Sequence, residues 1–145
     1  MLRYMLDTNL CIQVLRDRPQ SLRDRFNAEA DGLCISTIIL TELLQGAAKS
    51  DRPAMNRTKV EQFAARMEVL PFGLEAAAHA ADIRADLERK GTSIGGYDIL
   101  IAGHARSRGL VVVTANLKKF EWVDGLRCED WLGSETTQGD TKRLR

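Results

Sequence analysis

The segment IGGYDILIAGHARSRGLVVVT, residues 94–114, decides the fold because it joins three structural signals in chain order. Its glycines indicate a loop, the residues from Asp98 onward have helical spacing, and Gly109 is a typical helix end. Residues 110–114, LVVVT, form an apolar run rich in β-branched residues, which is typical of a parallel strand covered on both faces. A helix leading directly into a buried strand is the repeating unit of an α/β fold.

The rest of the chain repeats this alternation. Apolar runs at 2–6, 33–36, 67–72 and 126–131 predict further strands. Helical patterns lie between them, at residues 10–18, 20–30, 38–49, 74–90 and from about Val60 after a polar break at 50–56. We therefore predict a three-layer α/β/α fold with a mainly parallel central sheet, formed by one domain at residues 1–132. Residues 133–145 are polar and predict a flexible tail.

Composition limits the class of protein without identifying it. The net charge of +1 gives no support by itself to a nucleic-acid substrate. Three cysteines, widely spaced, predict reduced thiols in a cytoplasmic protein and no zinc site. The N-terminus does not resemble a signal peptide, and no stretch approaches the roughly 20 apolar residues of a membrane span, so we expect a soluble protein.

Three acidic residues stand in apolar surroundings at the boundaries of predicted elements. Asp7 ends the first strand, Glu42 lies on a mostly apolar helix, and Asp98 opens the helix after the glycine loop. Helix capping by Asp7 or Asp98 and a surface ion pair of Glu42 remain open alternatives. Asp7 and Asp98 nevertheless stand where parallel-sheet active sites form, and isolated buried carboxylates require a cation or hydrogen-bond donors.

If these carboxylates converge, a hard divalent cation is the ligand that best relieves their charge. Mg²⁺, or Mn²⁺ in its place, takes oxygen ligands and keeps several waters. No Ser/His or Cys/His pair stands in a matching place, so water is the expected nucleophile. The pattern favours metal-dependent phosphodiester hydrolysis.

Four ordered segments carry a family resemblance: MLDTN at 5–9, STIILTELLQGA at 36–47, the segment at 94–114, and GLRCEDW at 125–131. Together they resemble the VapC-type PIN-domain toxins of the enterobacterial subgroup. The resemblance implies a Mg²⁺-dependent, site-specific endoribonuclease of a type II toxin–antitoxin system, with initiator tRNA cut in the anticodon loop. It also implies a homodimer and a VapB-type antitoxin partner.

The same resemblance carries the family's acidic cluster onto Asp7, Glu42 and Asp98. A further acidic or polar position falls on Asn116, which can hydrogen-bond a metal-bound water. Three residues later, where relatives often have another acid, this chain has Lys119. That departure puts a fourth carboxylate and a second metal in doubt.

Basic residues near the expected site are candidates for binding RNA phosphates, although exposed basic residues on helices are more often simply solvated. The candidates are Arg84, Lys118 and Lys119. Trp122 and Trp131 are predicted to pack in a core or dimer interface rather than stack on bases.

The two histidines are predicted to be structural or surface residues, and three apolar residues are predicted to contact a partner. His79 and His104 are predicted to be structural or surface residues, because six positions of helix turn His104 away from Asp98. Leu10, Ile12 and Leu15 are predicted to form a surface for the antitoxin.

Other classes of protein remain possible on sequence alone. One is a PIN nuclease of RNA processing without an antitoxin, and another is a catalytically inactive RNA-binding module. A receiver-like signalling domain is disfavoured, because the expected adjacent acids and strand-end lysine are missing.

Overall fold

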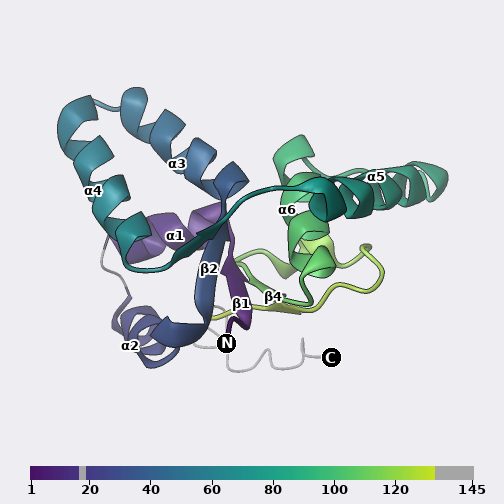
Figure 1. The fold of residues 1–145 in the computed structure, drawn as a ribbon, viewed down its shortest axis with the longest axis horizontal. Helices are drawn as coiled ribbons and strands as arrows, with labels where there is room; N and C mark the ends of the chain where they lie inside the picture. Colours follow the sequence, from purple (N-terminus) through teal and green to yellow (C-terminus); the bar gives the residue numbers. More distant parts are fainter. Residues whose placement is uncertain (17–18, 133–145) are drawn as a thin grey trace.

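The computed structural model describes residues 1–16 and 19–132, so the predicted tail at 133–145 lies outside the described residues (Figure 1). Its centre is a five-stranded sheet in which every strand pair is parallel, in the order β3-β2-β1-β4-β5. The strands are β1 Tyr4–Leu6, β2 Leu33–Ser36, β3 Glu68–Leu70, β4 Val111–Val113 and β5 Cys128–Glu129. The helices are α1 Thr8–Leu15, α2 Gln20–Ala28, α3 Thr37–Ala48, α4 Pro53–Ala65, α5 Leu74–Arg89 and α6 Gly96–Ser107. One-turn 3-10 helices cover Ala30–Gly32 and Leu117–Phe120.

The strand order places the helices in two layers. The chain passes from β1 to β2 to β3 in one direction, and right-handed crossovers put α1 to α4 on one face of the sheet. It then returns past β1 to β4, which puts α5 and α6 on the other face. Figure 1 shows α1, α3 and α4 on one side of the strands and α5 and α6 on the other. The predicted α/β fold with a parallel central sheet is confirmed.

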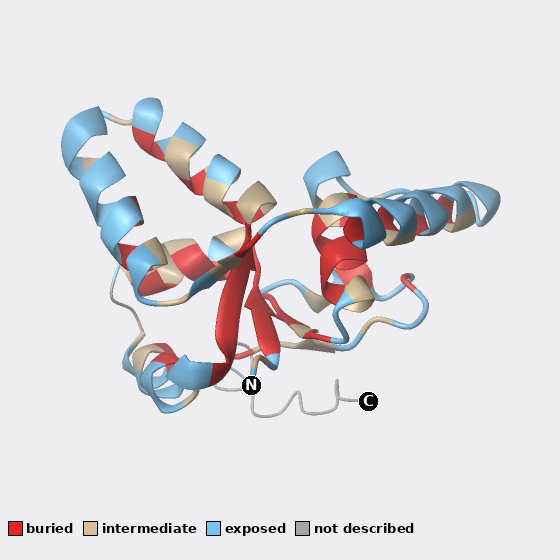
Figure 2. Ribbon diagram, in the orientation of Figure 1, coloured by how far each residue is buried: buried red, intermediate tan, exposed pale blue. Residues whose placement is uncertain are grey.

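Burial explains why the short strands form. Every residue of β1 and β2 is buried, and Figure 2 shows the centre of the sheet as the most buried part of the fold. Ser36 ends β2 and caps α3, with its Oγ accepting a hydrogen bond from the Ile38 N–H at 3.0 Å. The predicted helix end at Gly109 is confirmed, and the helix expected at 74–90 ends at Arg89, two residues before Gly91. Both glycines have positive φ angles, +71° at Gly91 and +67° at Gly109, which favour glycine.

Helices α5 and α6 cross closely at a glycine. A Cβ placed on Gly103 would lie 2.5 Å from the backbone nitrogen of Ala80, a distance that real Cβ atoms do not tolerate. The missing side chain therefore lets α6, which carries Asp98, pack directly against the backbone of α5.

Two predicted helix starts were wrong. Helix α4 begins at Pro53 rather than near Val60, because proline is favoured at the first helical position and the predicted polar break is correspondingly shorter. Helix α6 begins at Gly96 with Gly95 at its N-cap, so Asp98 lies inside the first turn and does not cap the helix.

The predictions for the two tryptophans had different outcomes, and those for the two histidines agree with the structure. Trp131 is buried and packs edge-on against Tyr4, with ring centroids 5.1 Å apart, whereas Trp122 is 51% exposed and is not part of the core. His104 is buried, with Nδ1 2.9 Å from Ser36 Oγ, and His79 accepts a hydrogen bond from Arg106 Nε at 2.9 Å. Both histidines therefore have structural roles.

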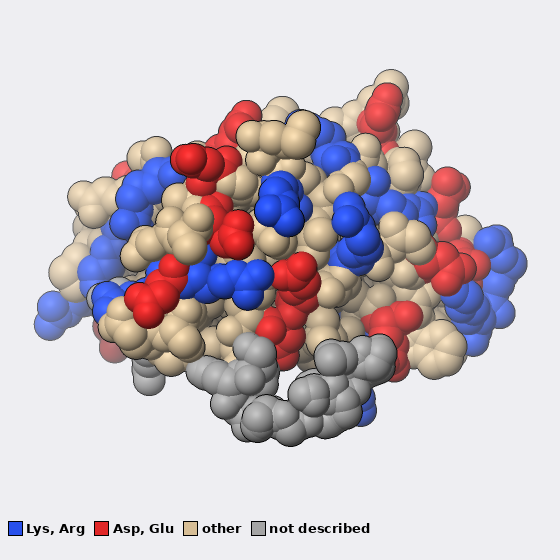
Figure 3. All heavy atoms as spheres, turned by 90° about the horizontal axis from the view of Figure 1, so that it is seen from below, with Lys and Arg blue, Asp and Glu red and all other residues tan. Residues whose placement is uncertain are grey.

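The surface and the cysteines agree with the composition. Charges of both signs are interspersed on the face that Figure 3 shows, as a net charge of +1 leads one to expect. The three cysteines are free thiols, and burial raises the pKa of Cys34 to about 12. Among residues 1–16 and 19–132, no helix combines the length and apolar character needed to cross a membrane.

Candidate active site

The site forms at the carboxyl edge of the sheet, between β1 and β4. These strands pair in the register Leu6 with Val113, so the next residues, Asp7 and Thr114, leave the sheet side by side. The chain turns to one side of β1 for β2 and to the other for β4, which makes this edge a topological switch point. Open α/β sheets bind ligands at such points.

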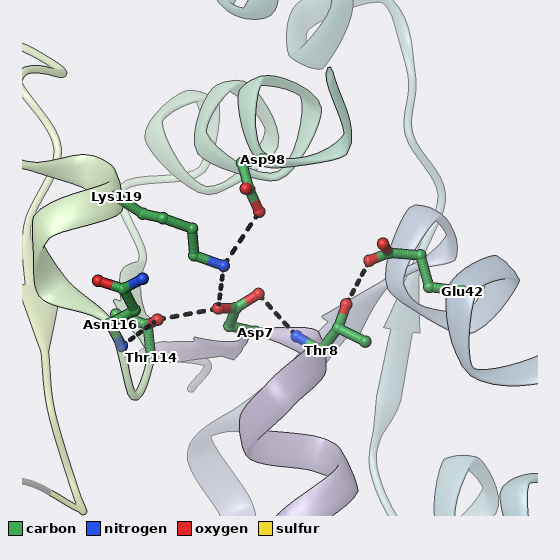
Figure 4. Close-up of polar contacts among 7 residues, drawn as sticks. All are labelled: Asp7, Thr8, Glu42, Asp98, Thr114, Asn116 and Lys119. Carbon is green, nitrogen blue, oxygen red and sulfur yellow. Dashed lines mark hydrogen bonds and ion pairs between the residues drawn. The ribbon is translucent and has the colours of Figure 1, made fainter. Parts of the chain in front are cut away.

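Asp7 is buried, with 1% of its surface exposed, and both of its carboxylate oxygens are occupied (Figure 4). Oδ1 accepts a hydrogen bond from the Thr8 N–H at 2.7 Å, which caps α1. Oδ2 accepts one from Thr114 Oγ1 at 2.8 Å and lies 3.2 Å from Lys119 Nζ. Asp7 thus combines the capping role that the sequence left open with a place in the acidic cluster.

Lys119 lies at the centre of the cluster. Its Nζ is 3.2 Å from Asp7 Oδ2 and 3.3 Å from Asp98 Oδ1, and its side chain is 22% exposed. Burial lowers the pKa of this ammonium, but Asp7 and Asp98 outweigh that effect and the net shift is upward, so the group stays charged. Sequence reasoning expected Lys119 among the RNA-binding residues near the site, whereas the structure pairs it with the acids themselves.

Asp98 reaches this cluster from the first turn of α6, where the helix dipole favours a negative charge. Burial raises the pKa of its carboxyl group, with Asp7 adding to the rise and Lys119 opposing it. A Cβ on Gly95 would lie 3.2 Å from Asp98 Oδ2, so the glycine before the helix leaves room for the carboxylate.

Glu42 lies on α3, on the other side of Thr8 from Asp7. Thr8 Oγ1 donates a short hydrogen bond to Glu42 Oε1 while its N–H donates to Asp7, so one residue links the two acids (Figure 4). Within the part of the chain that the structure describes, no three His, Cys, Asp or Glu side chains are close enough together to hold a metal ion. The structure therefore brings Asp7 and Asp98 together directly around Lys119 and connects Glu42 to them through Thr8.

Asn116 stands beside this group without joining it through its side chain. Its backbone N–H donates to Thr114 Oγ1 at 3.0 Å, and the residue is exposed. Thr8 and Thr114 both position Asp7 by hydrogen bonds, and neither was among the predicted site residues. The available signal was that Thr8 follows Asp7 directly and that Thr114 ends the apolar run at 110–114.

The remaining basic candidates lie farther out. Lys118 is exposed beside Lys119 on the same 3-10 turn. Arg84 is exposed, forms an ion pair with Glu88 at 3.3 Å, and lines a groove of about 590 Å³ between α5 and α6 that contains none of the acids.

The chemistry of the donor set suits a hard divalent cation. The facing oxygens of Asp7 and Asp98 already hold one cation, the Lys119 ammonium, between them. Mg²⁺ prefers carboxylate oxygens and is commonly held by one or two of them, with waters completing its shell. The buried carboxylate of Asp7 and the partly buried one of Asp98, with Glu42 linked to them through Thr8, form a donor set of this kind.

Comparison with known proteins agrees with this geometry. The PIN domain family matches residues 4–126. The chain is 53% identical over 131 residues to the tRNA(fMet)-specific endonuclease VapC of Salmonella typhimurium, covering 90% of this chain and 99% of that protein. It is 46% identical to the ribonuclease VapC2 of Haemophilus influenzae, covering 91% of this chain and 100% of that protein.

Solved structures give the same result. A DNA-bound VapBC structure from Salmonella typhimurium superposes with a TM-score of 0.88 at 53% identity, covering 90% of this chain and 99% of the other. VapBC2 from Rickettsia felis gives a TM-score of 0.85 at 34% identity, again covering 90% and 99%. The match extends over nearly the whole length of each relative. On these grounds the chain belongs to the PIN-domain family and, within that family, to the VapC ribonucleases.

Proposed function

We propose that this chain is the toxin of a type II toxin–antitoxin system, a Mg²⁺-dependent endoribonuclease that cuts initiator tRNA in the anticodon loop and thereby stops translation in the cytoplasm. The substrate follows the name of the Salmonella typhimurium relative, a tRNA(fMet)-specific endonuclease. The observation that carries the proposal is the buried carboxylate of Asp7, which faces Asp98 across a cation at the switch point of the sheet.

In this proposal Asp7, Asp98 and Glu42 would hold the Mg²⁺, or Mn²⁺ in its place, and Asn116 would assist through a hydrogen bond. The metal would supply an acidic water and compensate the charge that develops on the phosphate. The protein's own residues prepare the site: Thr8 and Thr114 fix the Asp7 carboxylate by hydrogen bonds from two directions.

Binding of the RNA backbone is proposed for the basic residues around this edge. Lys118 is exposed on the turn that also carries Lys119, so its ammonium is free to meet a phosphate that approaches the acids. Arg84 is left out of this binding surface, because it lines the α5–α6 groove that is proposed below as the dimer interface.

The antitoxin partner is proposed to occupy a groove of about 300 Å³ that the structure forms between α1, α3 and α4. Its apolar lining includes Ile12, Leu15, Leu43 and Val60, and Glu42 also lines it. An apolar antitoxin segment seated there contacts a proposed catalytic residue, which explains how it blocks cleavage. Leu10 was also expected on this surface, but that prediction was wrong because Leu10 lies on the buried side of α1 and is fully buried.

A homodimer is proposed across the α5–α6 groove, whose lining is mostly apolar and includes the exposed Tyr97. Ala77 lies on this groove and is exposed, so Ala77→Glu leaves the core intact and places a charge in the interface. Light scattering is expected to show a dimer for the wild type and a shift toward monomer for the variant. A monomeric wild type would refute this part of the proposal.

The experiment that tests the function is cleavage of purified initiator tRNA by the full-length chain, with Mg²⁺ or with EDTA. Asp7→Ala is compared with Asp51→Ala, a matched control at an exposed acid. We expect one cut in the anticodon loop, retained by Asp51→Ala and lost with Asp7→Ala or EDTA. Metal-dependent cutting of another RNA in place of this tRNA would overturn the substrate, and no cutting of any RNA would leave a binding module in place of an enzyme.

A further inference from the structure

We propose that Lys119 is a resident cation of the active site, so that the site holds a single divalent ion, and that this ion binds by displacing the lysine ammonium from between Asp7 and Asp98. The inference rests on the proposed metal-dependent activity and concerns how the metal is held. It follows from three features of the structure: the geometry around Nζ, the charge of the cluster, and the way the lysine backbone is fixed.

The geometry places the ammonium where a bridging metal is expected. Nζ lies at nearly equal distances, 3.2 Å and 3.3 Å, from one oxygen of Asp7 and one oxygen of Asp98. These are the facing oxygens of the two acids, so a divalent ion and the ammonium compete for the same ligands (Figure 4). Close approach of two cations is unfavourable, and metal binding therefore requires the lysine to move away.

The charge of the cluster sets how many ions it can hold. Asp7, Asp98 and Glu42 contribute three negative charges and Lys119 one positive charge, which leaves −2. One divalent ion brings the cluster to zero, whereas two would leave +2 in a half-buried site. Such an uncompensated charge is costly to bury, so the structure favours one ion.

The backbone of the lysine is held in place while its side chain can swing. Lys119 lies on the 3-10 helix Leu117–Phe120, which the buried Phe120 anchors to the core. The lysine side chain is 22% exposed and has a flexible four-carbon stem. After displacement the fixed backbone keeps the ammonium within reach of the site but away from the metal, where a phosphate oxygen of the RNA is the natural partner.

The test measures metal binding by the full-length protein, without RNA, by calorimetric titration with Mn²⁺ and by the electron paramagnetic resonance signal of free Mn²⁺. The variants are Lys119→Met, which removes the charge, and Lys119→Gln, which removes it but keeps a hydrogen-bond donor in case the apolar side chain disturbs folding. Lys118→Met is the matched control, because it removes the same charge from the neighbouring exposed residue.

We expect the wild type to bind one Mn²⁺ and both Lys119 variants to bind it at least about tenfold more tightly, since each loses the competing cation. The control should change the affinity by less than about threefold, because an exposed charge acts only through solvent. Two Mn²⁺ per wild-type chain, or equal affinities of the wild type and the Lys119 variants, would overturn the proposal while leaving metal-dependent activity intact. If neither the wild type nor any variant bound Mn²⁺, the metal site itself would be refuted.

Discussion

The ion pair between Asp7 and Lys119 should contribute measurably to folding when no metal is present. At the observed 3.2 Å, the attraction is about 5 kcal/mol for an effective dielectric constant of about 20. The cost of desolvating a carboxylate that is 1% exposed removes much of this gain. Asp98, at 3.3 Å from the same Nζ, still holds the lysine when Asp7 is neutralised. We therefore expect a coupling free energy of about 1–3 kcal/mol between Asp7 and Lys119.

The coupling is measured by a double-mutant cycle of Asp7→Asn and Lys119→Met. Urea unfolding is followed by far-ultraviolet circular dichroism at pH 7 in EDTA. Lys119→Met alone should cost about 3 kcal/mol, because it leaves a buried carboxylate without its cation. A parallel cycle with Lys118→Met should show coupling within about 0.5 kcal/mol of zero. A similarly small value in the Lys119 cycle would show that the lysine does not pair with Asp7 in solution, and the reasoning on the resident cation would then fail.

Three further predictions concern the framework and the edge of the site. Gly103→Ala should lower the free energy of unfolding by about 3 kcal/mol, since its Cβ would lie 2.5 Å from the Ala80 backbone. Gly46→Ala is the control and should raise the free energy of unfolding by about 0.5–1 kcal/mol, because its Cβ would have no atom within 4 Å. Both are measured by urea unfolding, and similar values for the two variants would refute the close helix crossing. Burial raises the pKa of Asp98 above 3.8, so the folded state binds more protons at this carboxyl group than the unfolded state does. The free energy of unfolding in EDTA should therefore fall as the pH rises from about 3.8 through the pKa of folded Asp98. Asp98→Asn should flatten that part of the pH–stability curve. Asn116→Ala keeps the backbone hydrogen bond of that exposed residue, so it should leave the thermal midpoint unchanged and slow tRNA cleavage by about 3–10-fold, as loss of one hydrogen bond implies.

The sheet was the most predictable part of the molecule. Strand β2 was expected at 33–36 and is observed at Leu33–Ser36. A strand covered on both faces is mostly apolar, and here Ser36 marks its end, so its limits are visible in the sequence. The helix ends at Gly91 and Gly109 were equally visible, because each requires a positive φ angle. Burial of a strand and the backbone sterics of a helix end depend on the residues of that segment, so both can be predicted from the sequence of the segment.

Helix starts were harder to predict where the cap is not a polar side chain. Helix α6 begins at Gly96, after Gly95, which makes no side-chain capping bond, so the start predicted at Asp98 was two residues too far along the chain. Helix α4 begins at Pro53 within a polar stretch that resembles a loop. Neither helix start has a side-chain capping hydrogen bond, so neither carries the polar signal that usually marks a helix start in a sequence.

The acids could be found from the sequence, but their connections could not. Asp7 and Asp98 were identified because charged residues are rare at the ends of apolar runs. The position of Lys119 depends on which way a long, flexible side chain folds back, and basic side chains are usually solvated. Only the three-dimensional arrangement distinguishes a lysine at the rim from one bound between two carboxylates.

The two oxygens of Asp7 show that helix capping and membership of the acidic cluster, which were alternatives from the sequence, do not exclude one another. Oδ1 is committed to the Thr8 N–H, which fixes the start of α1 and through Thr8 the distance to Glu42. Oδ2 receives Thr114 and Lys119, so it is the oxygen whose partners can change. A residue that served only as a helix cap would not need a second, charged partner, and a residue that served only as a metal ligand would not need the first. Capping holds the carboxylate rigid, and that rigidity lets one oxygen exchange an ammonium for a metal ion without moving the helix.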